Sequence, residues 1–238
     1  PASARIEIDG RPLAPPRRAY LMLNKPRGLV TTAADERGRD TVYRCLEGLD
    51  LPHLAPVGRL DMASEGLLLM TNDGAFAQAV THPSGGISKL YRVTVQPRAD
   101  EAQILKLSSG VVLDDGTKTM PCAINVVTDE PGRTVMEMTL KEGKNREIRR
   151  AMTEIGLTVN RLIRISYGPF RLNELQPGEV ALEAQQPTET PKEEPMLIPR
   201  PTLSLAAAEY FDLKIRNPFW GEVRNDDDMF TSPEIAYV

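Results

Sequence analysis

Apolar and polar residues alternate along residues 20–182 in a way that predicts short strands interleaved with short helices. The continuous apolar run at 66–71 indicates a strand covered on both faces. Other strands are expected at 5–8, 20–23, 29–32, 90–95, 122–127, 134–140 and 157–167. Helices are expected at 42–49, 75–80, 101–107 and 145–155. Because tight turns join several strand pairs, the pattern predicts an α+β fold whose mixed, mainly antiparallel sheet carries flanking helices.

Changes in hydrophobic patterning and in proline and acidic content divide the chain into three parts. Residues 1–19 hold one short strand and a proline-containing connector, and 20–184 form the densely patterned domain. Residues 185–238 begin with a proline-rich linker and end in an acidic tail. The tail is expected either to be disordered or to dock through Phe211, Phe219 and Trp220.

Composition excludes several classes of protein. The 238 residues are 41% hydrophobic and 26% charged, which is ordinary for a globular chain. No apolar run approaches the length of a membrane span, and no secretory signal is visible. Two cysteines rule out a disulfide framework, and with two histidines they form no zinc-binding spacing. We therefore expect a cytoplasmic protein with no metal.

Charge is segregated along the chain, although the net charge is only −4. The segment 141–171 has eight basic and three acidic residues, whereas 185–238 has five basic and ten acidic residues. A polyanion would therefore bind at the basic segment.

Three features could carry chemistry. Asp61 and Arg59 lie in a glycine-flanked loop at the mouth of the apolar strand, although an aspartate there is often only a turn residue. The helix expected at 145–155, capped by Asn145, carries a row of arginines that could bind phosphate, hold a carboxylate or merely face solvent. Tyr91 lies between cations in a strand, where it could stack on a base or belong to the core.

Six collinear motifs resemble RNA pseudouridine synthases of the RsuA-like branch, which modifies ribosomal RNA. The motifs are LNKPRGLVTT at 23–32, GRLDMASEGLLLMTNDG at 58–74, THPS at 81–84, KLYRV at 89–93, GKNREIRRAM at 143–152 and RLIRISYGPFRLNELQPGE at 161–179. The resemblance implies a central RNA-binding cleft and isomerisation of uridine to pseudouridine without metal or cofactor. Members commonly begin with a small S4-type domain; here only RIEIDGRPL resembles its linking strand, so that domain is either trimmed or naturally missing.

The resemblance also implies roles for individual residues. Asp61 is expected to be the nucleophile or base, with Arg149 as its basic partner, and Tyr91 is expected to stack on the uracil. Arg59 is expected to hold the flipped nucleotide, and Leu162 to support Tyr91. Phosphate contacts are expected from Lys25, Arg27, Lys89, Lys144, Arg146 and Arg150. The implied partner is ribosomal RNA, bound by a monomer.

Two other functions fit parts of the pattern. A non-catalytic RNA-binding protein would need the cations but not Asp61, Tyr91 and Arg149 together. A glycosidase would use Asp61 and Glu65 as paired carboxylates. A further hypothesis is that the acidic tail covers the basic cleft and screens out non-specific RNA.

Overall fold

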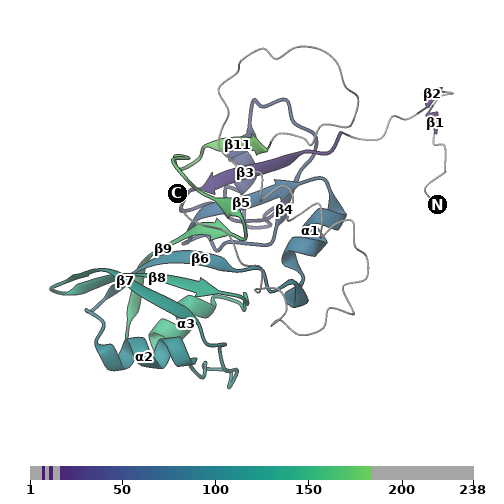
Figure 1. The fold of residues 1–238 in the computed structure, drawn as a ribbon. Coiled ribbons are helices and arrows are strands. Elements are labelled where there is room, and N and C mark those ends of the chain that lie inside the picture. The colour runs from purple at the N-terminus through teal and green to yellow at the C-terminus, as the bar shows by residue number, and fades with distance from the viewer. Residues whose placement is uncertain (1–6, 9–10, 13–16, 184–238) are drawn as a thin grey trace, which may run out of the picture. The chain divides into compact units, whose positions relative to one another are not determined.

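The computed structural model describes residues 7–8, 11–12 and 17–183, and Figure 1 shows the arrangement of their elements. The strands are β1 (Glu7–Ile8), β2 (Arg11–Pro12), β3 (Tyr20–Lys25), β4 (Ala55–Val57), β5 (Glu65–Thr71), β6 (Lys89–Gln96), β7 (Ala123–Glu130), β8 (Arg133–Leu140), β9 (Thr158–Tyr167), β10 (Phe170–Arg171) and β11 (Val180–Glu183). The α-helices are α1 (Gly74–Thr81), α2 (Glu101–Ser109) and α3 (Glu147–Glu154). Two 3-10 helices are η1 (Val42–Leu46) and η2 (Pro83–Gly85). The expectations for 185–238 lie outside the described residues and stay predictions.

One nine-stranded sheet organises residues 17–183. Its strand order is β11-β3-β5-β9-β6-β8-β7, with β4 beside β5 and β10 beside β9. All of its strand pairs are antiparallel except β5 and β9, which run parallel. Helices α2 and α3 lie against the end of the sheet that contains β6, β8 and β7 (Figure 1). This architecture confirms the predicted α+β fold. Within the described ranges, no helix has the length and apolar character needed to cross a membrane.

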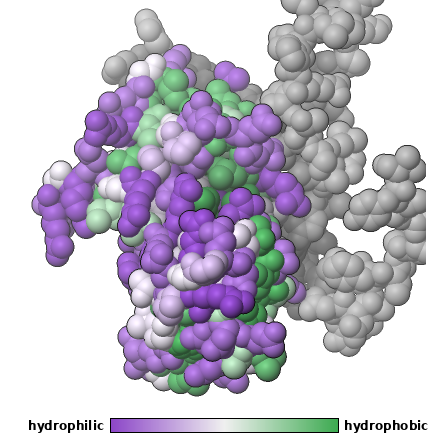
Figure 2. All heavy atoms as spheres, turned by 90° about the vertical axis from the view of Figure 1, so that its left-hand side faces the viewer, coloured by the Kyte–Doolittle hydropathy of each residue, from purple (hydrophilic) through white to green (hydrophobic). Residues whose placement is uncertain are grey.

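The sheet carries a hydrophobic core on each half. The first core packs β3 and β5 against the loops around them: Leu21, Leu23, Leu68 and Met70 meet Val42, Leu54 and Leu60. The second core packs β6, β8 and β9 against α2 and α3: Val93, Met136 and Leu162 share a cluster with Leu107, Ile148 and Met152. Outside these cores, the face shown in Figure 2 is mostly hydrophilic, with hydrophobic residues visible in patches. Tyr91 is half-buried and packs against both cores, so it lies where the two halves meet.

A short parallel ladder joins the two halves. Strands β5 and β9 share the register pairs Glu65–Ile163 and Gly66–Arg164. Gly66 has φ +104°, and a Cβ atom at this position would lie 2.3 Å from the carbonyl oxygen of Arg164. Only glycine tolerates both this backbone conformation and this close approach.

The local differences from the predicted pattern occur mainly at element ends. Helix α3 begins at Glu147, and its N-cap is Arg146 in the left-handed region, with φ 49° and ψ 29°. The expected cap, Asn145, is therefore wrong. The strand expected at 29–32 is reduced to an isolated bridge between Val30 and Thr41. In each case the tertiary contacts outweigh the local preference.

Candidate active site

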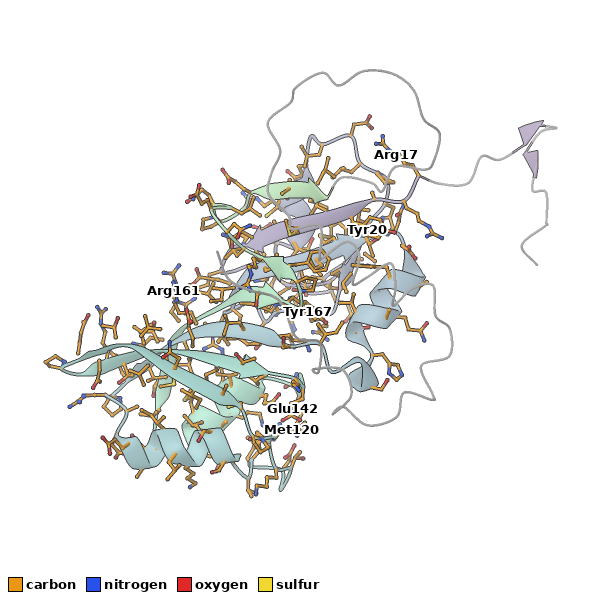
Figure 3. All side chains as sticks on the ribbon, viewed as in Figure 1. Arg17, Tyr20, Met120, Glu142, Arg161 and Tyr167 are labelled. Atoms are coloured by element: carbon orange, nitrogen blue, oxygen red, sulfur yellow. The ribbon has the colours of Figure 1, made fainter. Side chains whose placement is uncertain are left out.

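A cleft of about 570 Å³ is lined by several parts of the described chain. The loop Gly58–Ser64 forms one wall, and the segment from Leu140 to Ile148 forms another. The floor comes from Lys89 and Tyr91 of β6 and from Leu162, Arg164 and Tyr167 of β9. Figure 3 labels three lining side chains from separate segments: Tyr167 in β9, and Glu142 and Met120 in loops. A cleft of this size can hold a nucleotide.

The floor of the cleft is set by the register between β6 and β9. Lys89 lies opposite Tyr167, and Tyr91 lies opposite Arg164. A bulge between these two pairs adds one residue to β9, so that Arg164 and Tyr167 both reach the cleft although they are three residues apart. Leu162 lies two residues before Arg164 and lines the same floor. The structure thus brings Tyr91 and Leu162 together, as expected, beside two cations.

The main chain around Asp61 is fixed by donors from several distant segments. The Thr31 hydroxyl donates to the Leu60 carbonyl at 2.7 Å, and the Gly28 amide donates to the Met62 carbonyl at 2.8 Å. The Ser64 amide closes the turn on the Asp61 carbonyl at 2.9 Å. These bonds engage main-chain atoms and do not involve the Asp61 carboxylate. The Asp61 side chain is 33% exposed and lines the cleft.

Lys25 also holds this loop, and its burial contradicts the expected phosphate contact. The side chain is fully buried, and its Nζ atom donates to the carbonyls of Ser64 at 2.9 Å and Pro26 at 3.0 Å. Burial lowers the pKa of Lys25 to about 8, while the Asp61 charge acts in the opposite direction. Because its ammonium group is buried and bonded to two carbonyls, Lys25 cannot reach a phosphate on the surface.

The ion pair of Asp61 is formed by a different arginine from the one expected. Arg146 Nη1 lies 3.7 Å from Asp61 Oδ2, and both side chains are partly exposed. Arg149 instead donates to the Ala63 carbonyl at 2.9 Å and to the Val159 carbonyl at 3.2 Å. Burial, followed by the Arg146 charge, lowers the pKa of Arg149, while Asp61 opposes this shift. Arg149 therefore connects the loop that carries Asp61 to β9. The direct ion pair expected between Arg149 and Asp61 is wrong, because Asp61 pairs with Arg146 instead.

The remaining expected phosphate contacts separate into two groups. Arg150 is bound by Asp114 and by Asp115, the latter at 2.7 Å, and it does not line the cleft, which contradicts its expected role. Lys144 lines the cleft, but its Nζ lies 2.7 Å from Glu142 Oε2. The exposed cations that line the cleft are Arg59, Lys141 and Arg146, and the exposed Arg27 lies close enough to Arg149 for their charges to interact.

A carboxyl pair at the cleft wall was missed by the sequence reasoning. Glu147 is buried at the start of α3, where it accepts from the Lys144 amide at 3.0 Å. Burial and the hydrogen bond with Glu142 raise the pKa of Glu147 to about 8, so it holds a proton at neutral pH. Glu142 and Glu147, two of the three acidic residues within the basic segment, were the available signal, but only the fold shows that they meet.

Glu65, the second carboxylate named in the glycosidase alternative, lies outside the cleft. Glu65 forms a two-pronged ion pair with Arg161, at 2.8 Å and 3.2 Å, and does not line the cleft. Figure 3 labels Arg161, which belongs to β9. Among the described residues, no cluster of three or more metal-binding side chains is found.

Comparisons with known proteins relate the chain to one family. A family model described as RNA pseudouridylate synthase matches residues 19–154. An uncharacterised RNA pseudouridine synthase of Aquifex aeolicus is 36% identical over 176 residues, covering 73% of this chain and 70% of the relative. A similarly described protein of Mycobacterium leprae is 39% identical over 181 residues, covering 73% and 68%. A crystal structure of a pseudouridylate synthase superposes with a TM-score of 0.64 at 28% identity, covering 71% of each chain.

Proposed function

Since the chain belongs to the RNA pseudouridylate synthase family and therefore isomerises uridine in RNA to pseudouridine, we propose that its substrate is a uridine of ribosomal RNA. The resemblance of the six motifs to the rRNA-modifying branch supports this choice. The basic stretch at 141–171 supports a large polyanionic partner.

We also propose that Asp61 carries the chemistry. The observation behind this assignment is that the Asp61 carboxylate is partly exposed at a cleft lined with cations. The loop that carries it is held through hydrogen bonds to its main chain. The reaction must break the bond between C1′ and N1, turn the uracil and join C5 to C1′. A carboxylate can serve as a nucleophile at the sugar or as a base that removes a proton from it.

The other lining residues supply binding and orientation. Tyr91 and Leu162 form a floor on which a flipped uracil can stack. Arg59 is exposed two residues before Asp61, where it can hold the flipped conformation. Arg27 and Arg146 are exposed and can contact phosphates at the mouth.

Mapping of pseudouridine in rRNA from cells with and without this gene tests the substrate. We expect at least one uridine whose modification disappears with the gene and returns with the wild-type protein. Complementation with Asp61→Asn, at equal protein level, should not restore it. An unchanged rRNA map, with a change in another RNA class, would redirect the substrate while leaving the family activity intact.

A further inference from the structure

We propose that Lys89 is a catalytic residue, whose ammonium group stabilises the negative charge that uracil acquires as the glycosidic bond breaks, and that Arg164 positions it. The proposal rests on the proposed active site at Asp61. It replaces the expected phosphate contact of Lys89 with a contact to the base.

The placement of Lys89 favours the base rather than the backbone of RNA. Lys89 is half-buried and stands on the floor of the cleft, two residues before Tyr91 on the same face of β6. Its Nζ lies near the opposite wall, 4.0 Å from where a Cβ atom of Gly143 would be. A uracil stacked on Tyr91 would therefore lie beside this ammonium group, while the phosphates remain at the cleft mouth.

The ammonium group keeps unused hydrogen-bonding capacity. It contacts the Ile87 carbonyl at a long 3.4 Å and lies 5.0 Å from the centre of the Tyr167 ring. Among the described residues, no carboxylate lies within ion-pair distance of it. Because an ammonium group has three N–H donors, at least one remains for a ligand in the cleft.

Arg164 keeps this position electropositive. It is 2% exposed, its Nε donates to the Leu67 carbonyl at 2.7 Å, and its Nη2 finds no acceptor in the described part of the chain. Its Cζ lies 4.9 Å from the centre of the Tyr167 ring, so two cations share one aromatic partner. Burial and then the Arg164 charge lower the pKa of Lys89, while Glu147 acts in the opposite direction. An anionic ligand would relieve this concentration of positive charge.

The reaction generates such an anion. When the bond between C1′ and N1 breaks, its electron pair leaves with N1, so the charge spreads over N1, O2 and O4 of the uracil. After the base turns, C5 forms the new bond to C1′ and loses its proton to a base or solvent, while N1 takes up a proton. The product thus has the composition of the substrate. A cation aimed at the departing base lowers the barrier of the first step without binding the neutral uridine more tightly.

Single-turnover assays with rRNA transcripts carrying tritium at C5 of uridine test the proposal, because isomerisation releases this tritium. At saturating RNA, Lys89→Met should slow release by roughly 100-fold, as loss of one charge-stabilising donor does elsewhere. Its Kd for RNA, and the dependence of that Kd on salt, should stay unchanged. The matched control is Arg92→Met, which removes a cation from the same strand at an exposed position paired with Glu137. This control should release tritium at the wild-type rate.

The pH profile separates catalysis from a structural role. Because a neutral lysine cannot stabilise an anion, the wild-type rate should fall at high pH. Lys89→Met should lack this limb, and Lys89→Arg should keep activity and move the limb upward. Arg164→Gln, if folded, should also move it upward, because the charge that lowers the Lys89 pKa is gone.

Two results would overturn the assignment. A Lys89→Met protein that turns over near the wild-type rate would exclude Lys89 from catalysis. A weaker Kd, with the salt slope reduced by about one, would identify Lys89 as a phosphate contact instead. If the wild-type protein releases no tritium from rRNA transcripts, the proposed substrate fails rather than Lys89, and the same variants are then compared on labelled total cellular RNA.

Discussion

The two walls of the cleft are built by different physical means. The Asp61 loop, Gly58–Ser64, is held through its main chain by donors from Thr31, Lys25 and Arg149. The opposite wall, Leu140 to Ile148, is held by side-chain charges, including the Glu142–Lys144 ion pair and the proton held between Glu142 and Glu147. The first wall fixes the position of Asp61, whereas the second contributes an electrostatic potential that depends on pH and salt. Loss of a residue that anchors the first wall should therefore affect both chemistry and folding, whereas loss of an exposed charge from the second should mainly affect RNA binding.

Asp61→Asn should give the largest effect on turnover. The amide keeps the shape of the side chain but cannot act as a nucleophile or base, so pseudouridine formation should fall by at least about 100-fold. Folding and most of the RNA affinity should remain, because the loop is held by its backbone. Tritium release and circular dichroism measure the two outcomes, and turnover near the wild-type rate in the purified protein would disprove the role of Asp61.

Arg149→Ala should loosen the Asp61 loop from β9. It removes the donor that Arg149 supplies to the half-buried carbonyls of Ala63 and Val159, which we expect to cost about 1–3 kcal/mol in the free energy of unfolding and most of the activity. Arg149→Lys should retain part of both. Denaturant unfolding provides the first measurement. Arg150→Ala is the matched control in the same helix, and equal losses in both variants would contradict the anchoring role.

Arg146→Asn should sharpen the contrast by changing RNA binding more than folding. Asparagine tolerates the left-handed backbone at this position while removing the charge. We expect a weaker Kd and a salt slope reduced by about one. Arg150→Gln should leave both unchanged, since this arginine is already neutralised by two aspartates. A reduced slope in Arg150→Gln would restore it as a phosphate contact.

Glu147→Gln should have the smallest effect on turnover at neutral pH, because glutamine resembles the protonated acid. Its effect should appear in stability. A carboxyl whose pKa is raised to about 8 by folding binds its proton more tightly in the folded state, so wild-type stability falls as pH rises from about 4.5 through 8. The variant should lack this decline and become the more stable protein above pH 8. Parallel pH dependences of the midpoint of thermal unfolding, Tm, would show that Glu147 does not hold the proton.

The sequence predicted those features that depend on local pattern or on family motifs. The buried strand at 66–71, the helix around Arg149 and the cleft holding Asp61, Tyr91 and Leu162 all follow from apolar spacing or from the resemblance. The strand and the helix are each visible in one run of neighbouring residues, and the three cleft residues each lie in a motif of the family.

The sequence did not predict partners that come from distant segments. Lys25 and Ser64 are 39 residues apart, and Arg149 and Ala63 are 86 residues apart, so no local spacing shows that these cations bind carbonyls rather than RNA. The bulge that brings Arg164 and Tyr167 to the same face likewise depends on the pairing of β9 with β6. A basic residue in a motif indicates that it lies near the site, but its actual partner depends on the fold.

The glycine at position 66 has a consequence for cooperativity. Each half of the sheet has its own core, and the ladder that joins β5 to β9 has two register pairs, one of them at Gly66. Asp61 precedes β5 on one half, whereas Lys89 and Tyr91 belong to the other. We therefore expect native-state hydrogen exchange to resolve two cooperative units, and a side chain placed at 66 to uncouple them. Such a protein would keep both cores protected while losing the alignment on which turnover depends.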